Sequence, residues 1–345
     1  MSFTSWITAV FSSFPLALLT ILTLAVIFVN GWTDAPNAIS SCVATRALSP
    51  GAAVGMAAVF NFLGLILTVS LNRTVTDTVY SMVDFGDNAE LSRLALCAGM
   101  VAVVLWAAVA WYFGIPTSES HALIAGITGA AIAINGGDGV RFSVWSRVLW
   151  GLLISVLLGF GLGWLSVRLI FFVFRRKNRR DSERFFRKAE ILGGAANAFL
   201  HGSQDGQKFI GVLLLSVAAS GNTSPPKEIP LWMILLCSGV LSFGTCLGGG
   251  RIIRAVGMKM LKTEGYQGVS ADLASAVSLG FCTLYGLPVS TTHVKTTALM
   301  GAGASVRLRS VNWSVAGQMI LAWVFTFPGC GLLGYCSVKL LLLLL

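Results

Sequence analysis

Apolar runs of about 20 residues follow one another along almost the whole chain, separated by short polar segments. A helix of that length spans the hydrocarbon core of a bilayer. The runs lie near 5–30, 51–71, 92–114, 117–135 and 148–174, and then near 189–220, 231–248, 268–286, 289–305 and 313–338. Charged residues are only 11% of the chain, against about a quarter in soluble domains. The sequence therefore predicts an all-α polytopic membrane protein of the cell membrane, with the lipid bilayer as its surroundings.

A polar block in the first half has a counterpart in the second half. The block NGWTDAPN covers residues 30–37, and HGSQDGQK covers residues 201–208, 171 residues later. The corresponding positions are Asn30 and His201, Asp34 and Asp205, and Asn37 and Lys208. A carboxylate at membrane depth costs roughly 2.5 to 3.5 kcal/mol on insertion scales, so a repeated one indicates function. Gly31 and Pro36 loosen the first helix at Asp34 and free backbone carbonyls for a ligand or an ion.

The duplication divides the chain into two repeats. Residues 1–174 form the first repeat, 175–190 a basic linker, and 191–345 the second repeat. Five runs in each repeat, an odd number, mean that the second enters the membrane from the opposite side. We therefore expect inverted-topology repeats of about five membrane segments each, with broken helices and hairpins meeting near the midplane.

The basic residues indicate which side faces the cytoplasm. Most of them lie in short connections, above all in 175–188, which we interpret as a solvated loop. Further ones are Arg46, those between Arg251 and Lys262, and Arg307 with Arg309. The positive-inside rule places these segments, and the linker, in the cytoplasm and both termini outside. This explains the net charge of +10 without a nucleic-acid partner, which would need a folded basic surface with interleaved aromatic residues.

A second duplicated motif opens a later apolar run in each half. PTSESH (residues 116–121) and PVSTTH (288–293) each place a proline and several hydroxyls at an expected helix N-terminus. Such an end carries partial positive charge and free N–H groups that suit an oxyanion, and in inverted repeats two ends can share one tetrahedral anion. The simpler alternative is helix capping. His121 and His293 either fix the hairpins by hydrogen bonds or handle ions and protons.

Further charges fall within the apolar runs. They are Glu119, Lys208, Asp272 and Lys295. At membrane depth such groups pair with one another or face water, and the sequence leaves the pairs open. Lys208 follows Asp205 by one helical turn, so its ammonium either pairs with that carboxylate, or lies beside the anion, or snorkels to the membrane surface.

At these four blocks the chain resembles the inorganic phosphate transporter (PiT) family, whose duplicated signature has the form GxNDxxNA followed by PxSxTH blocks. The resemblance covers nearly the whole chain. It implies secondary, cation-coupled uptake of inorganic phosphate, a homodimer, and no cofactor beyond the coupling ion. Carried over by position, it places the cation near Asp34, Asn37 and Asp205. It places phosphate near Ser118, Ser120, Ser290, Thr291 and Thr292.

The chain departs from the family pattern at three of these positions. Thr33 and Gln204 stand where the family usually has Asn, and we count both as candidate cation ligands. Lys208 replaces the later Asn of the second block, and we count it with the phosphate ligands. Its ammonium can neutralise Asp205 and remove one sodium site, so the coupling ion is a proton or a sodium ion held at Asp34. His121, His293, Glu119 and Lys295 are expected to support the site.

Three other functions share some of these sequence features with phosphate transport. A sulfate permease of the same fold is the main alternative, because hydroxyls and N–H groups accept either tetrahedral anion. An anion channel fits less well, because two breaks per half at a closed midplane site favour alternating access. An intramembrane hydrolase would use Ser118 or Ser290 with a histidine, but the chain has no GxSxG elbow. We therefore expect a transporter and not an enzyme.

Overall fold

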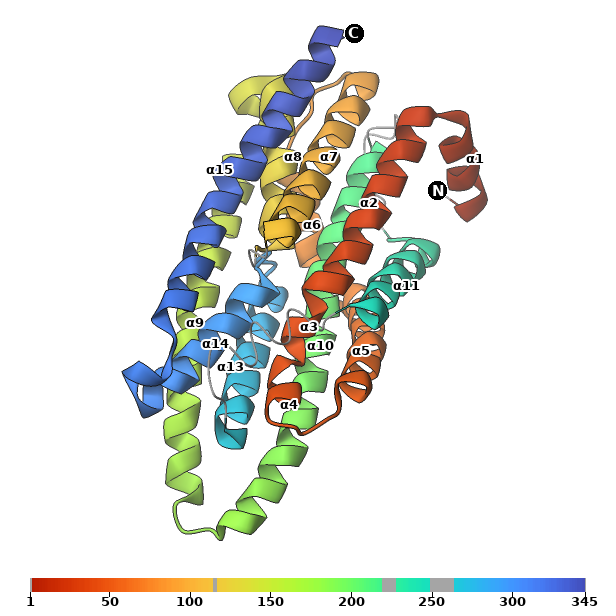
Figure 1. Ribbon diagram of the computed structural model, residues 1–345. Helices are drawn as coiled ribbons and strands as arrows, with labels where there is room; N and C mark the ends of the chain where they lie inside the picture. The colour runs from red at the N-terminus through yellow and green to blue at the C-terminus, as the bar shows by residue number, and fades with distance from the viewer. Residues whose placement is uncertain (1, 114–116, 219–227, 249–263, 345) are drawn as a thin grey trace.

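The computed structural model describes residues 2–113, 117–218, 228–248 and 264–344, and these residues fold almost entirely into helices (Figure 1). The first half contains α1 (Phe3–Ser12), α2 (Phe14–Thr33), α3 (Ala35–Ala38), α4 (Ser40–Ala44), α5 (Pro50–Leu71), α6 (Thr74–Ser81), α7 (Ala89–Phe113), α8 (Glu119–Asn135) and α9 (Phe142–Phe174). The second contains α10 (Arg179–Ala218), α11 (Leu231–Leu247), α13 (Gly265–Leu284), α14 (Thr291–Val306) and α15 (Trp313–Leu344). Pro116 and the basic residues Arg251, Arg254, Lys259 and Lys262 lie outside the described residues.

Within the described residues, five helical segments are long and apolar enough to cross a membrane. They are Phe14–Ala38, Pro50–Leu71, Ala89–Ala110, Phe142–Phe174 and Ala316–Leu344. The helices α8 and α14 have 17 and 16 residues and are buried along most of their length. Each packs against the long helix that precedes it, α7 or α13, so the two pairs form hairpins inside the protein. This all-helical, multi-pass architecture agrees with the prediction.

The two halves exchange their packing partners. Helix α8 of the first half packs along α15 of the second, and α14 of the second packs along α9 of the first. In the same reciprocal way, α10 packs on α5 and α2 packs on α11. Figure 1 shows α2 and α9 running toward the bottom of the molecule and α10 and α15 running toward the top. This arrangement is compatible with inverted repeats, and it interlocks the halves around a common centre.

Close helix contacts repeat with the same symmetry. A Cβ on Gly31 would lie 2.1 Å from the carbonyl oxygen of Leu241 on α11. A Cβ on Gly202, the corresponding position of α10, would lie 2.1 Å from the carbonyl oxygen of Asn61 on α5. Only glycine permits backbones to approach this closely. The glycines of the two polar blocks therefore hold equivalent crossings in the two halves.

Two details differ from the sequence expectations. The run near 5–30 is two helices, because Pro15 lacks the N–H that would continue α1 into α2, and the break falls at Ser13. The basic residues expected in a solvated loop are in part helical, since α10 begins at Arg179.

Both chain ends lie in the upper half of Figure 1, and the connection between α9 and α10 lies at the bottom. Which of these faces is cytoplasmic remains a prediction, as do the domain boundaries.

The close crossing of α9 and α14 can be tested with a matched pair of glycines. A Cβ on Gly163 would lie 2.3 Å from the carbonyl oxygen of Ala298, whereas one on Gly161 of the same helix meets nothing within 4 Å. We expect Gly163→Ala to destabilise the detergent-solubilised protein by about 1 to 3 kcal/mol, because α9 and α14 must separate. Gly161→Ala should be neutral or stabilise by up to about 1 kcal/mol. Thermal unfolding of both variants measures the difference, and equal transitions would show that this crossing is not tight.

Candidate functional site

The first polar block ends a helix, and the second does not. Helix α2 stops at Thr33, Asp34 is its C-cap, and the chain continues through the single turn α3. Pro36 lies in the first turn of α3, where its missing N–H prevents α2 from continuing. Asp205 instead lies within the unbroken helix α10, whose block contains no proline. The expected break is therefore found at Asp34, and the expectation of two breaks per half is wrong for the second half.

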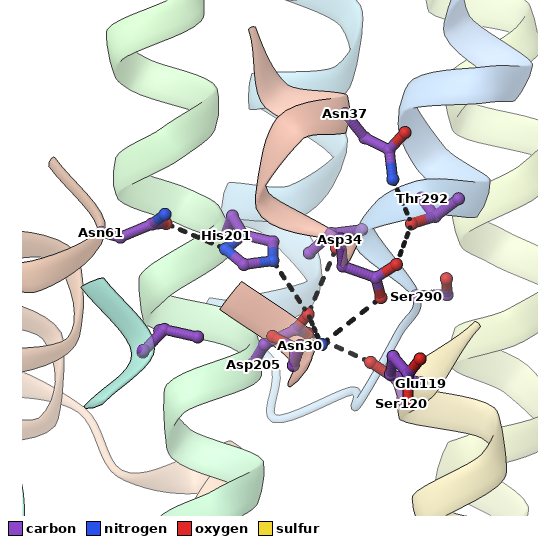
Figure 2. A network of polar contacts seen from close by, with 12 residues as sticks. Asn30, Asp34, Asn37, Asn61, Glu119, Ser120, His201, Asp205, Ser290 and Thr292 are labelled. Atoms are coloured by element: carbon purple, nitrogen blue, oxygen red, sulfur yellow. Dashed lines mark hydrogen bonds and ion pairs between the residues drawn. The ribbon is translucent and has the colours of Figure 1, made fainter. Parts of the chain in front are cut away.

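The two aspartates meet through Asn30. The Nδ2 atom of Asn30 lies 3.4 Å from Asp34 Oδ2 and 3.2 Å from Asp205 Oδ2. Figure 2 shows Asn30 between the two carboxylates, with α2 and α10 contributing one aspartate each. Both aspartates are buried. The duplicated blocks thus form one site at the centre of the protein.

Asp205 is surrounded by donors. Its Oδ1 lies 2.5 Å from Lys208 Nζ and 3.2 Å from Ser120 Oγ. Its Oδ2 accepts from Asn30 and from Thr291 Oγ1, at 3.3 Å for the latter, and lies 3.3 Å from His201 Nε2. Lys208 is fully buried and also donates to Ser120 Oγ and to the Val289 carbonyl. The snorkelling alternative is therefore wrong, and the ammonium neutralises Asp205.

Asp34 has a sparser environment. Thr292 Oγ1 donates to its Oδ1 at 3.1 Å, and Thr292 in turn accepts from Asn37 Nδ2 at 2.8 Å. A cavity of about 10 Å³ borders this carboxylate, which is about the space that one water or small ion occupies. Its lining residues are Asp34, Asn37, Ala38, Asn197, His201, Leu279, Thr291 and Lys295. Asn37 Oδ1 has no hydrogen-bond partner among the described residues.

The two hydroxyl motifs begin α8 and α14. Ser118 is the N-cap of α8 and accepts from the His121 N–H at 3.3 Å, and Ser290 is the N-cap of α14 and accepts from the His293 N–H at 3.3 Å. These two serines thus act as caps, which was the simpler interpretation of the motif. The next hydroxyls in each motif reach the charged centre, since Ser120 and Thr291 both contact Asp205. Two helix N-termini from opposite halves therefore converge on one carboxylate.

The histidines of these motifs pack against each other. The rings of His121 and His293 are 4.2 Å apart between centroids and nearly perpendicular. Phe327 and Trp323 of α15 flank them, at 4.5 Å from His121 and 3.6 Å from His293. No hydrogen-bond partner for His121 Nδ1 or His293 Nε2 occurs among the described residues. The contact that joins the hairpins is thus an edge-to-face contact between the two rings and not the expected hydrogen bond.

The remaining candidates lie around this centre in different roles. Thr33 Oγ1 donates to the Val29 carbonyl and lies 3.5 Å from Glu119 Oε1. Gln204 Nε2 donates to the Leu287 carbonyl at 3.0 Å and so holds the segment before α14, while its Oε1 has no hydrogen-bond partner among the described residues. Lys295 pairs with Asp272 and so resolves a pairing that the sequence left open.

Asn61 is a site residue that the sequence analysis missed. Its Oδ1 lies 2.9 Å from His201 Nδ1, and its Nδ2 donates to Thr245 Oγ1. A single amide within the apolar run 51–71 was the signal that could have revealed it. The contact orients the imidazole so that its other nitrogen faces Asp205 (Figure 2).

The fold and the site define a multi-pass membrane protein with a closed polar centre between two interlocked halves. Residues 30–334 match the phosphate transporter family, PHO4. A relative from Bacillus subtilis (strain 168), named "Probable low-affinity inorganic phosphate transporter", is 34% identical over 317 residues, which are 92% of this chain and 94% of the relative. A relative of the same name from Mycobacterium bovis (strain ATCC BAA-935 / AF2122/97) is 36% identical over 324 residues. The match covers 93% of this chain and 76% of the relative's length.

A solved structure of "The sodium-dependent phosphate transporter" shares the fold, with a TM-score of 0.88 and 21% identity over 96% of this chain and 100% of that one. The chain belongs to the phosphate transporter family. The resemblance stated from the four blocks is thus confirmed, as are the multi-pass membrane placement and the expectation of a transporter and not an enzyme.

The Lys208–Asp205 pair can be tested with a double-mutant cycle. Lys208→Met leaves a buried carboxylate without its cation, so we expect about 3 to 5 kcal/mol of destabilisation in thermal unfolding. Asp205→Asn together with Lys208→Met removes both charges and keeps amide contacts to Asn30 and Thr291, so most of that loss should disappear. Additive effects of the two substitutions would contradict the pairing.

Proposed function

We propose that the protein takes up inorganic phosphate across the cell membrane as a secondary symporter, driven by one cation, a proton or a sodium ion, that binds on the Asp34 side. Membership of the phosphate transporter family supplies the substrate class. The unequal surroundings of Asp34 and Asp205 carry the proposal for coupling.

A metal cation is unfavourable beside Asp205. The Lys208 ammonium lies 2.5 Å from Oδ1, and a second cation about 4 Å from it would meet a repulsion of about 4 kcal/mol at an effective dielectric of 20. Both carboxylate oxygens already have hydrogen-bond donors. Asp205 would therefore stay paired with Lys208 and hold the central side chains in place without binding the coupling ion.

Asp34 offers the better position for the coupling ion. No cationic side chain lies within ion-pair distance of it among the described residues. Asp34 and Asn37 line the same small cavity, and Asn37 Oδ1 has no hydrogen-bond partner among the described residues. Lys295 also lines this cavity, but its ammonium is paired with Asp272. Hard cations favour carboxylate and amide oxygens, and a proton needs only the carboxylate. A proton or one sodium ion at Asp34 would each cancel the remaining negative charge.

Phosphate would bind where the N-termini of α8 and α14 converge. Ser120, Thr291, Thr292 and Lys208 are the side-chain donors there, and Ser118 and Ser290 support them as caps. An arriving oxyanion competes with Asp205 and Asp34 for these donors, which form charge-assisted hydrogen bonds. Carboxylates near the anion also favour phosphate over sulfate, because phosphate keeps an O–H that can donate to a carboxylate and sulfate does not.

Radiolabelled phosphate uptake into proteoliposomes tests the function and its coupling. We expect an inward proton gradient or an inward sodium gradient to accelerate uptake over no gradient, with excess sulfate competing weakly. Asp34→Asn should abolish the acceleration, because it removes the group that binds the coupling ion. Asp87→Asn, a matched change at an exposed loop position, should behave as wild type. Uptake that is equal under all three conditions, with Asp34→Asn unaffected, would refute symport.

A further inference from the structure

A buried ion pair lies on one side of the central site. Lys295 Nζ binds Asp272 Oδ1 and lies 3.2 Å from Ser41 Oγ, which also donates to Asp272 Oδ2 at 3.0 Å. Asn197 Nδ2 donates to the backbone carbonyl of Asp272 at 3.0 Å. All four residues are at most 2% exposed. We call Lys295, Asp272, Ser41 and Asn197 the Lys295 cluster.

The corresponding positions of the other side are apolar. The polar blocks repeat after 171 residues and the hydroxyl motifs after 172. The offset of 171 relates Ser41 and Asn197 to their counterparts, and the offset of 172 relates Asp272 and Lys295 to theirs. The counterparts are Leu123 for Lys295, Met100 for Asp272, Val212 for Ser41 and Val26 for Asn197. All four are buried in one hydrophobic core cluster. The two sides of the central site thus share a backbone arrangement and differ in chemistry.

The Lys295 cluster connects the central site to one face of the protein. Lys295 and Asn197 line the cavity that Asp34 also borders. From Ser41, α4 leads to Thr45, whose hydroxyl bonds to Glu190 near the start of α10. Figure 1 shows α4, α13 and the first turns of α10 on the side of the α9–α10 connection. Polar side chains therefore extend from the centre toward that face, whereas the counterpart positions on the other side are apolar.

Stability does not account for this ion pair. Replacing a buried ion pair by apolar residues of similar volume is often neutral or stabilising. The first half shows that this backbone accommodates a leucine and a methionine at the equivalent positions. An ammonium at the edge of an anion site recognises an oxyanion, and a nearby carboxylate keeps that ammonium neutralised when no anion is present.

We propose that Lys295 is a second binding station for the phosphate oxyanion, between the central site and the face of the α9–α10 connection, with Asp272 releasing the ammonium when the anion arrives. This inference rests on the proposed function. It makes transport unsymmetrical, because an anion moving to or from that face meets a cationic group and an anion at the other face meets none.

Exchanging the ion pair for its counterparts tests the station. Lys295→Leu with Asp272→Met leaves no unpaired charge, and Leu123→Met with Met100→Leu is the matched control on the apolar side. Phosphate transport is measured in vesicles of known orientation, with phosphate offered at either face. We expect the first variant to raise the KM at the α9–α10 face about tenfold, because it removes a charge-assisted contact. Its KM at the other face and both KM values of the control should match wild type.

An equal rise of KM at both faces would overturn the station, since the pair would then only support the central site. Unchanged KM values at both faces would overturn it as well. Asp272→Asn is a second variant that keeps the ammonium, and freeing it should lower the KM at the α9–α10 face about threefold. An unchanged or higher KM there contradicts the proposal. A wild-type protein that transports no phosphate would instead refute the proposed function, so the two failures are distinguishable.

Discussion

The contact between Lys208 and Asp205 lies where the two halves meet, and the arrangement of the centre depends on it. Charges at membrane depth are costly unless they are paired or face a polar cavity. The Lys208 ammonium reaches Asp205 on its own helix, Ser120 at the start of α8, and the Val289 carbonyl just before α14. One cation therefore joins α10 to both converging hairpins, and with them the first half to the second.

This pairing makes a duplicated site unequal. The two blocks supply one aspartate each, and Asn30 holds both carboxylates within one network. Lysine in place of the second asparagine neutralises Asp205 and leaves Asp34 as the carboxylate with the sparser surroundings. Unequal residues at equivalent positions recur in the Lys295 cluster, where a polar side faces an apolar one. The two interlocked halves provide a common frame, and Lys208 and Lys295 distinguish its two sides.

The sequence predicted the features that arise from local chemistry. Run lengths predicted the five helical segments that are long and apolar enough to cross a membrane, out of ten runs. Pro36 predicted the break at Asp34, and the position of Ser118 and Ser290 before apolar runs predicted two helix N-termini. The features that it did not predict depend on tertiary contacts. Lys295 and Asp272 are 23 residues apart, and only the packing of α14 on α13 makes them partners.

Gln204 and Asn61 show the same limit at the level of one side chain. Gln204 falls in the expected ligand block, but its amide binds the Leu287 carbonyl of another segment. Asn61 is the single amide in the apolar run 51–71, and it becomes a site residue because α5 packs against α10. The second block stays helical because it has no proline. The two blocks have the same residue spacing, and spacing alone does not indicate this difference in helix continuity.

We propose that the Lys208 ammonium takes the place of one cation beside Asp205. The most direct measurement is phosphate uptake by wild type and Lys208→Asn, which restores the residue of the first block, as a function of sodium concentration and pH. We expect the uptake rate of wild type to depend non-cooperatively on the concentration of one cation. We expect Lys208→Asn to acquire a steeper sodium dependence, because sodium then neutralises Asp205. A wild type that is already steeply and cooperatively sodium-dependent, with the variant unchanged, would contradict this proposal.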